Sequence, residues 1–227
     1  MEIKPIAHIH TGYSEKFGIP RQSGLVEGTF ARIVFEPEYR HPDALRGIEE
    51  YSHLWLIWDF SENHRDKWNA TVTPPRLGGR ERMGVFATRS PFRPNPIGLS
   101  CVKLVSVEND DKDGGVLTVE GADMLDGTPI YDIKPYLPYA DSHPDARGSF
   151  GEEHKDRQLE VVADEDIKSV LEPGVFETVC RLIAIDPRTA FIHDEERIWG
   201  LSYEGWNIRF KVAGNTARIT EITKLKI

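Results

Sequence analysis

Hydrophobic and polar residues alternate with a period of two along much of the first half of the chain. Ile3–His10 and Gly28–Phe35 follow this pattern, which is typical of strands that bury one face. Tyr51–Phe60 is almost entirely apolar and aromatic, so it predicts a strand buried on both faces, with a buried helix as the alternative. Further short strands are expected at residues 83–87, 97–107 and 115–119, and a short helix at 43–50.

Clusters of turn residues separate these segments. The run DDKDGG at residues 110–115 has the composition of a hairpin loop. Many short strands with few helices favour a closed barrel, because closure removes the exposed edges of a sheet. We therefore expect a mainly β fold, with an N-terminal β-barrel domain followed by a small C-terminal α+β domain.

The pattern changes in the second half of the chain. Residues 141–151 are polar and rich in Gly, Pro and Ser, which is typical of a linker. Helical periodicity then predicts helices within residues 164–171 and 175–186. Alternation predicts three strands at residues 198–203, 206–213 and 216–225. The expected organisation is a barrel domain at 1–142, a linker at 143–151 and the C-terminal domain at 152–227.

Composition restricts the class of protein. With 39% hydrophobic residues the chain can bury a substantial core. No apolar run approaches the roughly 20 residues that span a bilayer, and the first residues lack the pattern of a secretory signal. The two cysteines show no paired spacing, so they suggest neither a disulfide framework nor a zinc site. We predict a cytoplasmic protein without a metal centre.

Charge is distributed unevenly along the chain. The formal net charge is -9, yet the 31-residue run from Pro74 to Leu104 contains six basic residues and one acid, Glu81. Prolines and glycines punctuate this run and restrict its conformation. A basic, conformationally restricted loop in an acidic protein suggests a site for an anion or a nucleic acid. An ordinary turn-rich connection with solvated arginines is the alternative.

Familiar catalytic motifs are not found. The sequence contains no nucleophile elbow, no phosphate-binding loop and no zinc-protease motif. His8 and His10 stand two residues apart on an expected strand, where a solvated pair is favoured over a metal site. Spacing alone therefore does not identify a reaction.

Longer segments resemble a known family. GVFATRSPFRPNPIGLS (84–100) and DGTPIYDIKPYLPYADS (126–142), with FGIPRQ and GIEEYSHLWLIWDF upstream, are similar to the tRNA N6-threonylcarbamoyladenosine methyltransferases, the TsaA-like β-barrel methyltransferases. The resemblance is strong over residues 1–142 and weaker beyond. It implies S-adenosylmethionine-dependent methylation of N6 of the modified adenosine next to the anticodon of tRNA. It also implies a homodimer with the cofactor near the subunit interface.

The resemblance further implies a cofactor pocket. Arg89 is a candidate to pair with the cofactor carboxylate and Leu99 to pack on its adenine. The alternative is that Arg89 and Asp126 form a structural ion pair and that Leu99 belongs to the core. The residues expected to bind the cofactor are Pro20, Arg21, Gln22, Ser61, Glu62, Arg89, Leu99, Asp123, Met124, Leu125 and Asp126.

Methylation of a urea-like N6 requires removal of its proton, because its lone pair is delocalised. Our hypothesis is that Asp126 or Asp132 assists this deprotonation. Arg93 or Lys134 would stabilise charge on the carbamoyl or threonyl group. A purely structural alternative is that Asp126 caps the turn it forms with Gly127.

The basic run also predicts contacts to tRNA. The candidates for phosphate contacts or base stacking in the anticodon loop are Arg76, Arg80, Arg82, Arg93, Phe92 and Tyr136. Two other functions remain open from the sequence: a non-catalytic RNA-binding or regulatory module, and a barrel enzyme, such as a methyltransferase, that acts on a small molecule.

Overall fold

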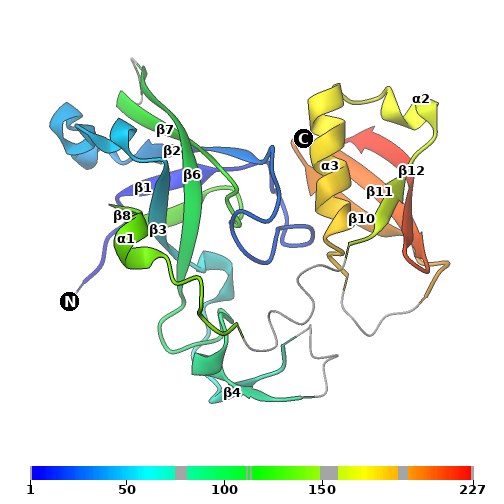
Figure 1. The fold of residues 1–227 in the computed structure, drawn as a ribbon, viewed down its shortest axis with the longest axis horizontal. Helices are drawn as coiled ribbons and strands as arrows, with labels where there is room; N and C mark the ends of the chain where they lie inside the picture. The colour runs from blue at the N-terminus through cyan, green and yellow to red at the C-terminus, as the bar shows by residue number, and fades with distance from the viewer. Residues whose placement is uncertain are drawn as a thin grey trace.

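Six antiparallel strands from residues 7–135 close into a barrel, in the order β1-β2-β7-β6-β3-β8 (Figure 1). The computed structural model describes residues 2–74, 81–110, 112, 114–148, 158–188 and 194–225. The predicted barrel is confirmed. Its strands are β1 (Ala7–His10), β2 (Phe30–Phe35), β3 (His53–Asp59), β6 (Ile97–Asp110), β7 (Gly114–Glu120) and β8 (Thr128–Pro135).

Alternating burial explains how β3 fits the barrel. Leu54, Leu56 and Trp58 point into the core, whereas the residues between them are only partly buried. The expectation that this strand is buried on both faces is therefore wrong, because the outer face of a barrel strand does not enter the core. Gly98 on β6 faces Trp58, and a Cβ there would come within 2.1 Å of the indole ring. Glycine at this position lets the two strands pair closely.

Three features of the N-terminal part differ from the sequence prediction. The strand expected at residues 83–87 is limited to Met83–Gly84, because Val85–Ala87 form a 3-10 helix. Residues 43–50 were expected to form a helix, but they form two short 3-10 helices separated by Gly47, whose φ is +85°. The strand β8 was not predicted, because its Pro and Asp residues and the preceding Gly127 are typical of a loop. Short elements complete this half: η1 (Pro37–Tyr39), η2 (Pro42–Leu45), η3 (Ile48–Glu50), η4 (Ser61–Asn63), β4 (Thr71–Val72), β5 (Met83–Gly84), η6 (Val85–Ala87) and α1 (Pro138–Asp141).

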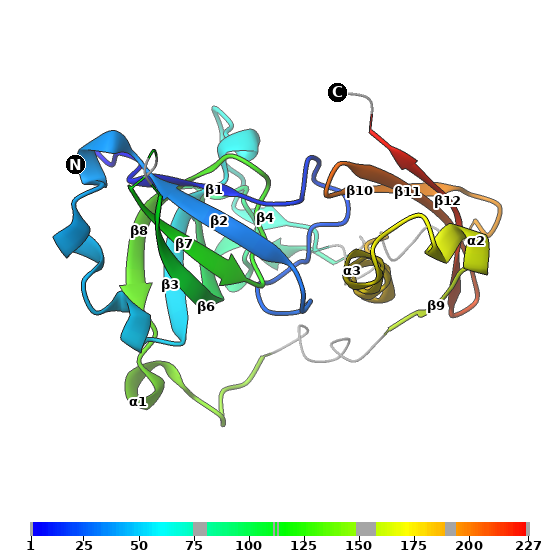
Figure 2. The same cartoon turned by 90° about the horizontal axis from the view of Figure 1, so that it is seen from above.

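The C-terminal unit is a four-stranded sheet packed against helices, as Figure 2 shows. The buried face of α3 carries Val179, Leu182 and Ile183, as its periodicity predicted. The predicted helices and strands occur with bounds shifted by a few residues, and one short strand, β9, was not foreseen. The elements are β9 (Glu160–Val162), α2 (Glu165–Lys168), α3 (Pro173–Ala184), β10 (Trp199–Tyr203), β11 (Trp206–Ala213) and β12 (Thr216–Lys224).

The segment between β1 and β2 packs against the C-terminal unit. Tyr13 and Val26 are buried in the same apolar cluster as the C-terminal sheet. The ring of Phe17 stacks on that of Trp199, with centroids 5.8 Å apart. This segment contains the sequence FGIPRQ, so the C-terminal unit supports a loop that was expected to bind a cofactor. In the described part of the chain, no helix is long and apolar enough to cross a membrane.

Candidate cofactor pocket

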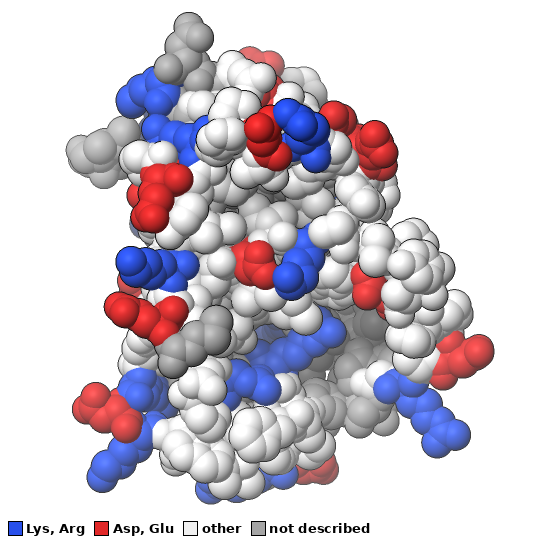
Figure 3. All heavy atoms as spheres, turned by 90° about the vertical axis from the view of Figure 1, so that its left-hand side faces the viewer, with Lys and Arg blue, Asp and Glu red and all other residues white. Residues whose placement is uncertain are grey.

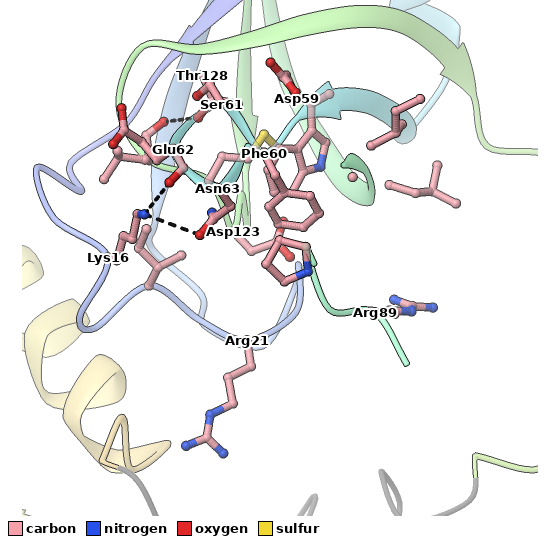
Figure 4. A pocket seen from close by; sticks show the side chains of 18 of the residues that line it. Lys16, Arg21, Asp59, Phe60, Ser61, Glu62, Asn63, Arg89, Asp123 and Thr128 are labelled. Atoms are coloured by element: carbon pink, nitrogen blue, oxygen red, sulfur yellow. Dashed lines mark hydrogen bonds between the residues drawn. The ribbon is translucent and has the colours of Figure 1, made fainter. Parts of the chain in front are cut away.

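A pocket of about 710 Å³ opens at the end of the barrel where β3 ends and β6 begins (Figure 4). Four stretches of the chain meet there: residues 16–22, residues 58–63, residues 88–99 and residues 123–128. A drug-sized ligand typically occupies a pocket of roughly 300–1,000 Å³. The barrel therefore brings segments that are far apart in sequence around a space that suits one small molecule.

Most residues expected to bind the cofactor line this pocket. Leu99 is 54% exposed and faces the pocket rather than the core, so the alternative that it belongs to the core is wrong. Asp126 is the one member of the expected set that is absent from the lining. The members that line the pocket are Pro20, Arg21, Gln22, Ser61, Glu62, Arg89, Leu99, Asp123, Met124 and Leu125.

Asp123 is the most strongly perturbed carboxyl group of the pocket. Burial raises its pKa to about 6, against a smaller opposing effect of the Ser100 hydroxyl. Ser100 Oγ donates to Asp123 Oδ1 across 2.5 Å and accepts from Trp58 Nε1 at 3.0 Å. This chain of hydrogen bonds fixes the orientation of the carboxyl group. A carboxyl group with such a pKa exchanges protons readily near neutral pH.

Two basic side chains, Lys16 and Arg89, also line the pocket. Lys16 Nζ donates to the carbonyl of Glu62 at 2.9 Å and to Asn63 Oδ1 at 3.4 Å, as Figure 4 shows. Arg89 donates to the side-chain oxygen of Gln22, so the alternative of a structural ion pair between Arg89 and Asp126 does not describe this guanidinium. Lys16 and Arg89 thus give the pocket a positive rim above a buried acid.

Arg21 lies at the edge of the pocket but reaches toward the C-terminal unit (Figure 4). Its Nη2 donates to the carbonyls of Asp186 and Arg188, at 3.3 and 2.9 Å. The side chains of Asp186 and Arg188 form an ion pair of 2.7 Å that is largely buried. Arg21 therefore connects the loop of residues 16–22 to the C-terminal unit by hydrogen bonds to the backbone of residues 186–188.

Three of the four residues in our catalytic hypothesis lie outside the pocket lining. Asp126 accepts from the backbone N–H of Thr11 at 3.1 Å and lies 3.3 Å from His10 Nδ1. Asp132 and Lys134 pair with each other at 2.9 Å on β8. Only Arg93 lines the pocket, where its guanidinium also donates to the carbonyls of Thr88 and Ser90.

Among the described residues expected to contact RNA, Arg82 and Phe92 line one cavity and Phe92 and Arg93 line a second, whereas Tyr136 lines neither. Arg76 and Arg80 lie outside the described residues. Arg82 lies on the β4–β5 hairpin and donates to Thr71 Oγ1 at 2.8 Å. The ring of Phe92 is covered on one face by the guanidinium of Arg65, 3.7 Å from the ring centroid. Tyr136 packs on Trp55 and His53, at the end of β3 opposite the pocket.

Several pocket residues were missed by sequence reasoning. They are Lys16, Asp59, Phe60, Asn63, Thr88 and Asn95. Asp59 Oδ1 lies 2.7 Å from Nε2 of His64 on the pocket wall. Lys16 adjoins FGIPRQ and Phe60 adjoins Ser61, so extending each expected segment by one residue would have found both. Among the described residues, no group of three or more His, Cys, Asp and Glu could hold a metal ion.

Comparisons with known proteins connect this pocket to a family. The tRNA-methyltransferase O N-terminal domain matches residues 8–142, and the TrmO C-terminal domain matches residues 156–225. The tRNA (adenine(37)-N6)-methyltransferase of Escherichia coli K12 is 40% identical over 221 residues, covering 93% of both chains. A putative S-adenosylmethionine-dependent methyltransferase of Pseudomonas aeruginosa is 38% identical over 212 residues, covering 88% of this chain and 89% of that protein.

Solved structures give the same result. The crystal structure of TrmO from Pseudomonas aeruginosa superposes with a TM-score of 0.79 and 29% sequence identity. The superposition covers 99% of this chain and 97% of that one. The similarity therefore extends across the barrel and the C-terminal unit.

Proposed function

Because this chain belongs to the tRNA-methyltransferase O family, we propose that it methylates N6 of adenosine 37 in tRNA, with S-adenosylmethionine as the methyl donor. The substrate form we propose is the threonylcarbamoylated adenosine. The observation that carries the proposal is the pocket at the barrel end, where the segments that resemble the family meet around one space. We further propose that the enzyme works as a homodimer in the cytoplasm, on the resemblance alone.

The pocket is chemically suited to S-adenosylmethionine. This cofactor combines an adenine ring, a positively charged sulfonium and an amino-acid end. Leu99, Leu125 and Phe60 provide apolar surface for the ring. Lys16 and Arg89 at the rim are suited to the carboxylate of the amino-acid end. When bound, the cofactor supplies an electrophilic methyl group.

Asp123 is our candidate for the proton acceptor. The nitrogen that receives the methyl group must lose a proton, and a carboxylate with a pKa of about 6 is largely ionised at neutral pH yet basic enough to accept one. We assign this role to Asp123 rather than to Asp126 or Asp132, because the latter two lie outside the pocket lining. Arg93, which lines the pocket, remains our candidate for stabilising charge on the modified base, whereas Lys134 is held by Asp132.

Nucleoside mass spectrometry tests the proposed function. The purified protein is incubated with S-adenosylmethionine and tRNA that carries threonylcarbamoyladenosine without its methyl group. We expect one methyl group on that nucleoside and none when the cofactor is omitted. Absence of methylation, with S-adenosylhomocysteine binding confirmed by calorimetry, would overturn the proposed substrate. Methylation of tRNA that lacks the threonylcarbamoyl group would show that plain adenosine suffices.

The role of Asp123 has a separate test. Asp123→Asn keeps the shape of the side chain but cannot accept a proton at neutral pH. We expect a loss of kcat, with S-adenosylmethionine and S-adenosylhomocysteine binding weakened equally or not at all. Selective loss of S-adenosylmethionine binding would instead make Asp123 the partner of the sulfonium charge, because the two ligands differ in that charge.

A further inference from the structure

Two large aromatic rings are exposed beside the cofactor pocket. Phe86 is 72% exposed and Trp68 is 50% exposed. Their ring centroids lie 6.1 Å apart with an angle of 31° between the planes. Two neighbouring aromatic rings left in solvent form an apolar surface that a folded chain would ordinarily cover.

The local backbone holds Phe86 outward. Val85, next to Phe86, is buried, and its N–H donates to the carbonyl of Ala70 at 2.9 Å. Thr88 Oγ1 donates back to the carbonyl of Val85 at 2.9 Å. Phe86 therefore projects from a short 3-10 turn that is anchored on both sides. The exposure of Phe86 is therefore a consequence of this hydrogen-bonded turn.

The rings border two cavities that adjoin the cofactor pocket. Trp68 lines a cavity of about 270 Å³, and Phe86 lines one of about 1120 Å³. Pro91 lines both of these cavities and the cofactor pocket as well. A nucleotide that follows or precedes one placed in the cofactor pocket would therefore meet the two rings.

Cations surround the aromatic pair. Arg82 and Arg89 line the larger cavity, which has no acidic residue among the described residues of its lining. Arg65, Lys67 and Arg93 line the smaller cavity, where Asp66 is the single acid of the described lining. The Arg93 guanidinium lies 6.0 Å from the centroid of Phe86. Figure 3 shows Lys and Arg side chains bordering a hollow in the lower half of the face that it draws.

We propose that Trp68 and Phe86 form a stacking platform for an unpaired nucleotide that flanks the target adenosine in the anticodon loop. The proposal rests on the proposed function, because that function places the target base in the cofactor pocket. Exposed rings combined with basic side chains are the features with which proteins hold single-stranded nucleic acid, through base stacking and phosphate contacts. The basic side chains around the rings are complementary to a phosphate backbone, and the rings themselves offer surface on which a base can stack.

The platform differs from the stacking residues expected from the sequence. One face of Phe92 is covered by Arg65, and Tyr136 lies at the other end of β3. Trp68 and Phe86 retain accessible ring surface near the pocket. Their position in or close to the strongly basic run is visible in the sequence, but their exposure is not.

Binding of an anticodon stem-loop tests the platform. The probe carries 2-aminopurine, whose fluorescence is quenched by stacking, on either side of position 37. The variants are Phe86→Ala, Trp68→Ala and Phe86→Tyr, which keeps an aromatic ring. Tyr139→Ala is the matched control, because Tyr139 is an 88% exposed aromatic residue on α1 that lines none of the three cavities.

We expect Phe86→Ala and Trp68→Ala to weaken RNA binding about 10-fold and to change the 2-aminopurine signal, since stacking on one ring contributes on that order. Phe86→Tyr and Tyr139→Ala should bind as the unchanged protein does. S-adenosylhomocysteine affinity should be the same in all four variants. Unchanged RNA binding in both alanine variants would overturn the proposal.

Two other outcomes are also decisive. Dissociation of a dimer in Phe86→Ala, without loss of RNA affinity per subunit, would show that a second copy covers the rings and would overturn the proposal. If the unchanged protein binds the stem-loop but methylates no tRNA, the proposed function fails while the platform is still judged by the binding data. The two proposals can therefore fail separately.

Discussion

Gly18 lies directly against the side chain of Leu201. A Cβ added to Gly18 would come within 1.8 Å of Leu201 Cδ1, and the φ of Gly18 is +94°, a conformation that side chains disfavour. Gly18 belongs to the loop that borders the cofactor pocket, and Leu201 belongs to the core of the C-terminal unit. This contact requires glycine for two independent reasons, one conformational and one steric.

Gly18→Ala should therefore destabilise the protein more than an ordinary glycine replacement. We expect a decrease of about 2–5 kcal/mol in the free energy of unfolding, measured in urea, because positive φ costs about 1–2 kcal/mol and overpacking adds about 1–3 kcal/mol. Gly24→Ala is the matched control: its φ is +73°, yet nothing lies within 4 Å of the added Cβ. Equal effects in both variants would show that the Leu201 contact gives way without cost.

The raised pKa of Asp123 predicts a pH-dependent stability. The folded carboxyl group has a pKa of about 6 against an ordinary value of 3.8, so the folded state binds the proton more tightly. Below about pH 4 the proton on this group adds to the free energy of unfolding, and this stabilisation is lost as pH rises toward 6. Asp123→Asn should remove this loss and raise the free energy of unfolding at pH 7 by about 1–3 kcal/mol. A variant less stable than the unchanged protein at pH 7 would contradict the cause we assign.

The same carboxyl group should control activity in the opposite direction. Because only the ionised form accepts a proton, kcat should fall as pH drops through about 6. Asp123→Asn should lower kcat by about 10²-fold or more, whereas Asp132→Asn should keep most of it. Asp132 has the same chemistry but pairs with Lys134 away from the pocket. Initial rates between about pH 5 and 8, with saturating tRNA and cofactor, measure both effects. A large loss of kcat in Asp132→Asn but not in Asp123→Asn would make Asp132 the proton acceptor.

The local pattern of apolar and polar residues predicted much of the fold. Strands such as β2 and β11 alternate apolar and polar residues, and this signal depends only on which face each residue presents. β8 was missed because its Pro129 and Pro135 and the preceding Gly127 are typical of loops. Its place in the barrel is secured by pairing with β1 and β3, which local propensity does not report.

The site was harder to predict because side-chain direction depends on distant contacts. Asp123 and Asp126 are three residues apart and chemically identical, yet one enters the pocket and the other bonds to the N–H of Thr11. Arg21 bends toward the carbonyls of Asp186 and Arg188, whose sequence separations from it are 165 and 167 residues. The resemblance identified the segments of the pocket. Only tertiary packing, including that of the C-terminal unit, decides which of their side chains face the ligand.

The contacts of Arg21 predict that the C-terminal unit acts on cofactor binding. Arg21→Gln removes the charge-assisted hydrogen bonds to the carbonyls of Asp186 and Arg188, each of which contributes about 1.5–3 kcal/mol. We expect S-adenosylhomocysteine affinity, measured by calorimetry, to fall about 10-fold as the loop of residues 16–22 loosens. Arg209→Gln removes an exposed arginine in the sheet of the C-terminal unit and should leave affinity unchanged. Equal affinities in both variants would exclude this coupling.

Arg82 provides a test of electrostatic contact with RNA. It lies on the β4–β5 hairpin and lines the cavity beside Phe86, where an RNA backbone would pass in our proposal. Arg82→Gln should weaken tRNA binding and reduce the slope of log K against log salt concentration by about 0.7–0.9, the effect of one lost phosphate contact.

Arg218→Gln is the control for Arg82, because Arg218 is also exposed but pairs with Asp164 in the C-terminal unit. Its salt slope should equal that of the unchanged protein, measured by anisotropy between about 50 and 200 mM salt. An unchanged slope in Arg82→Gln would mean that Arg82 contacts no phosphate of the bound tRNA. A reduced slope in Arg218→Gln would extend the RNA contact to the C-terminal unit. Because the slope counts released counterions, it separates a lost phosphate contact from general weakening by misfolding, which lowers affinity without changing the slope.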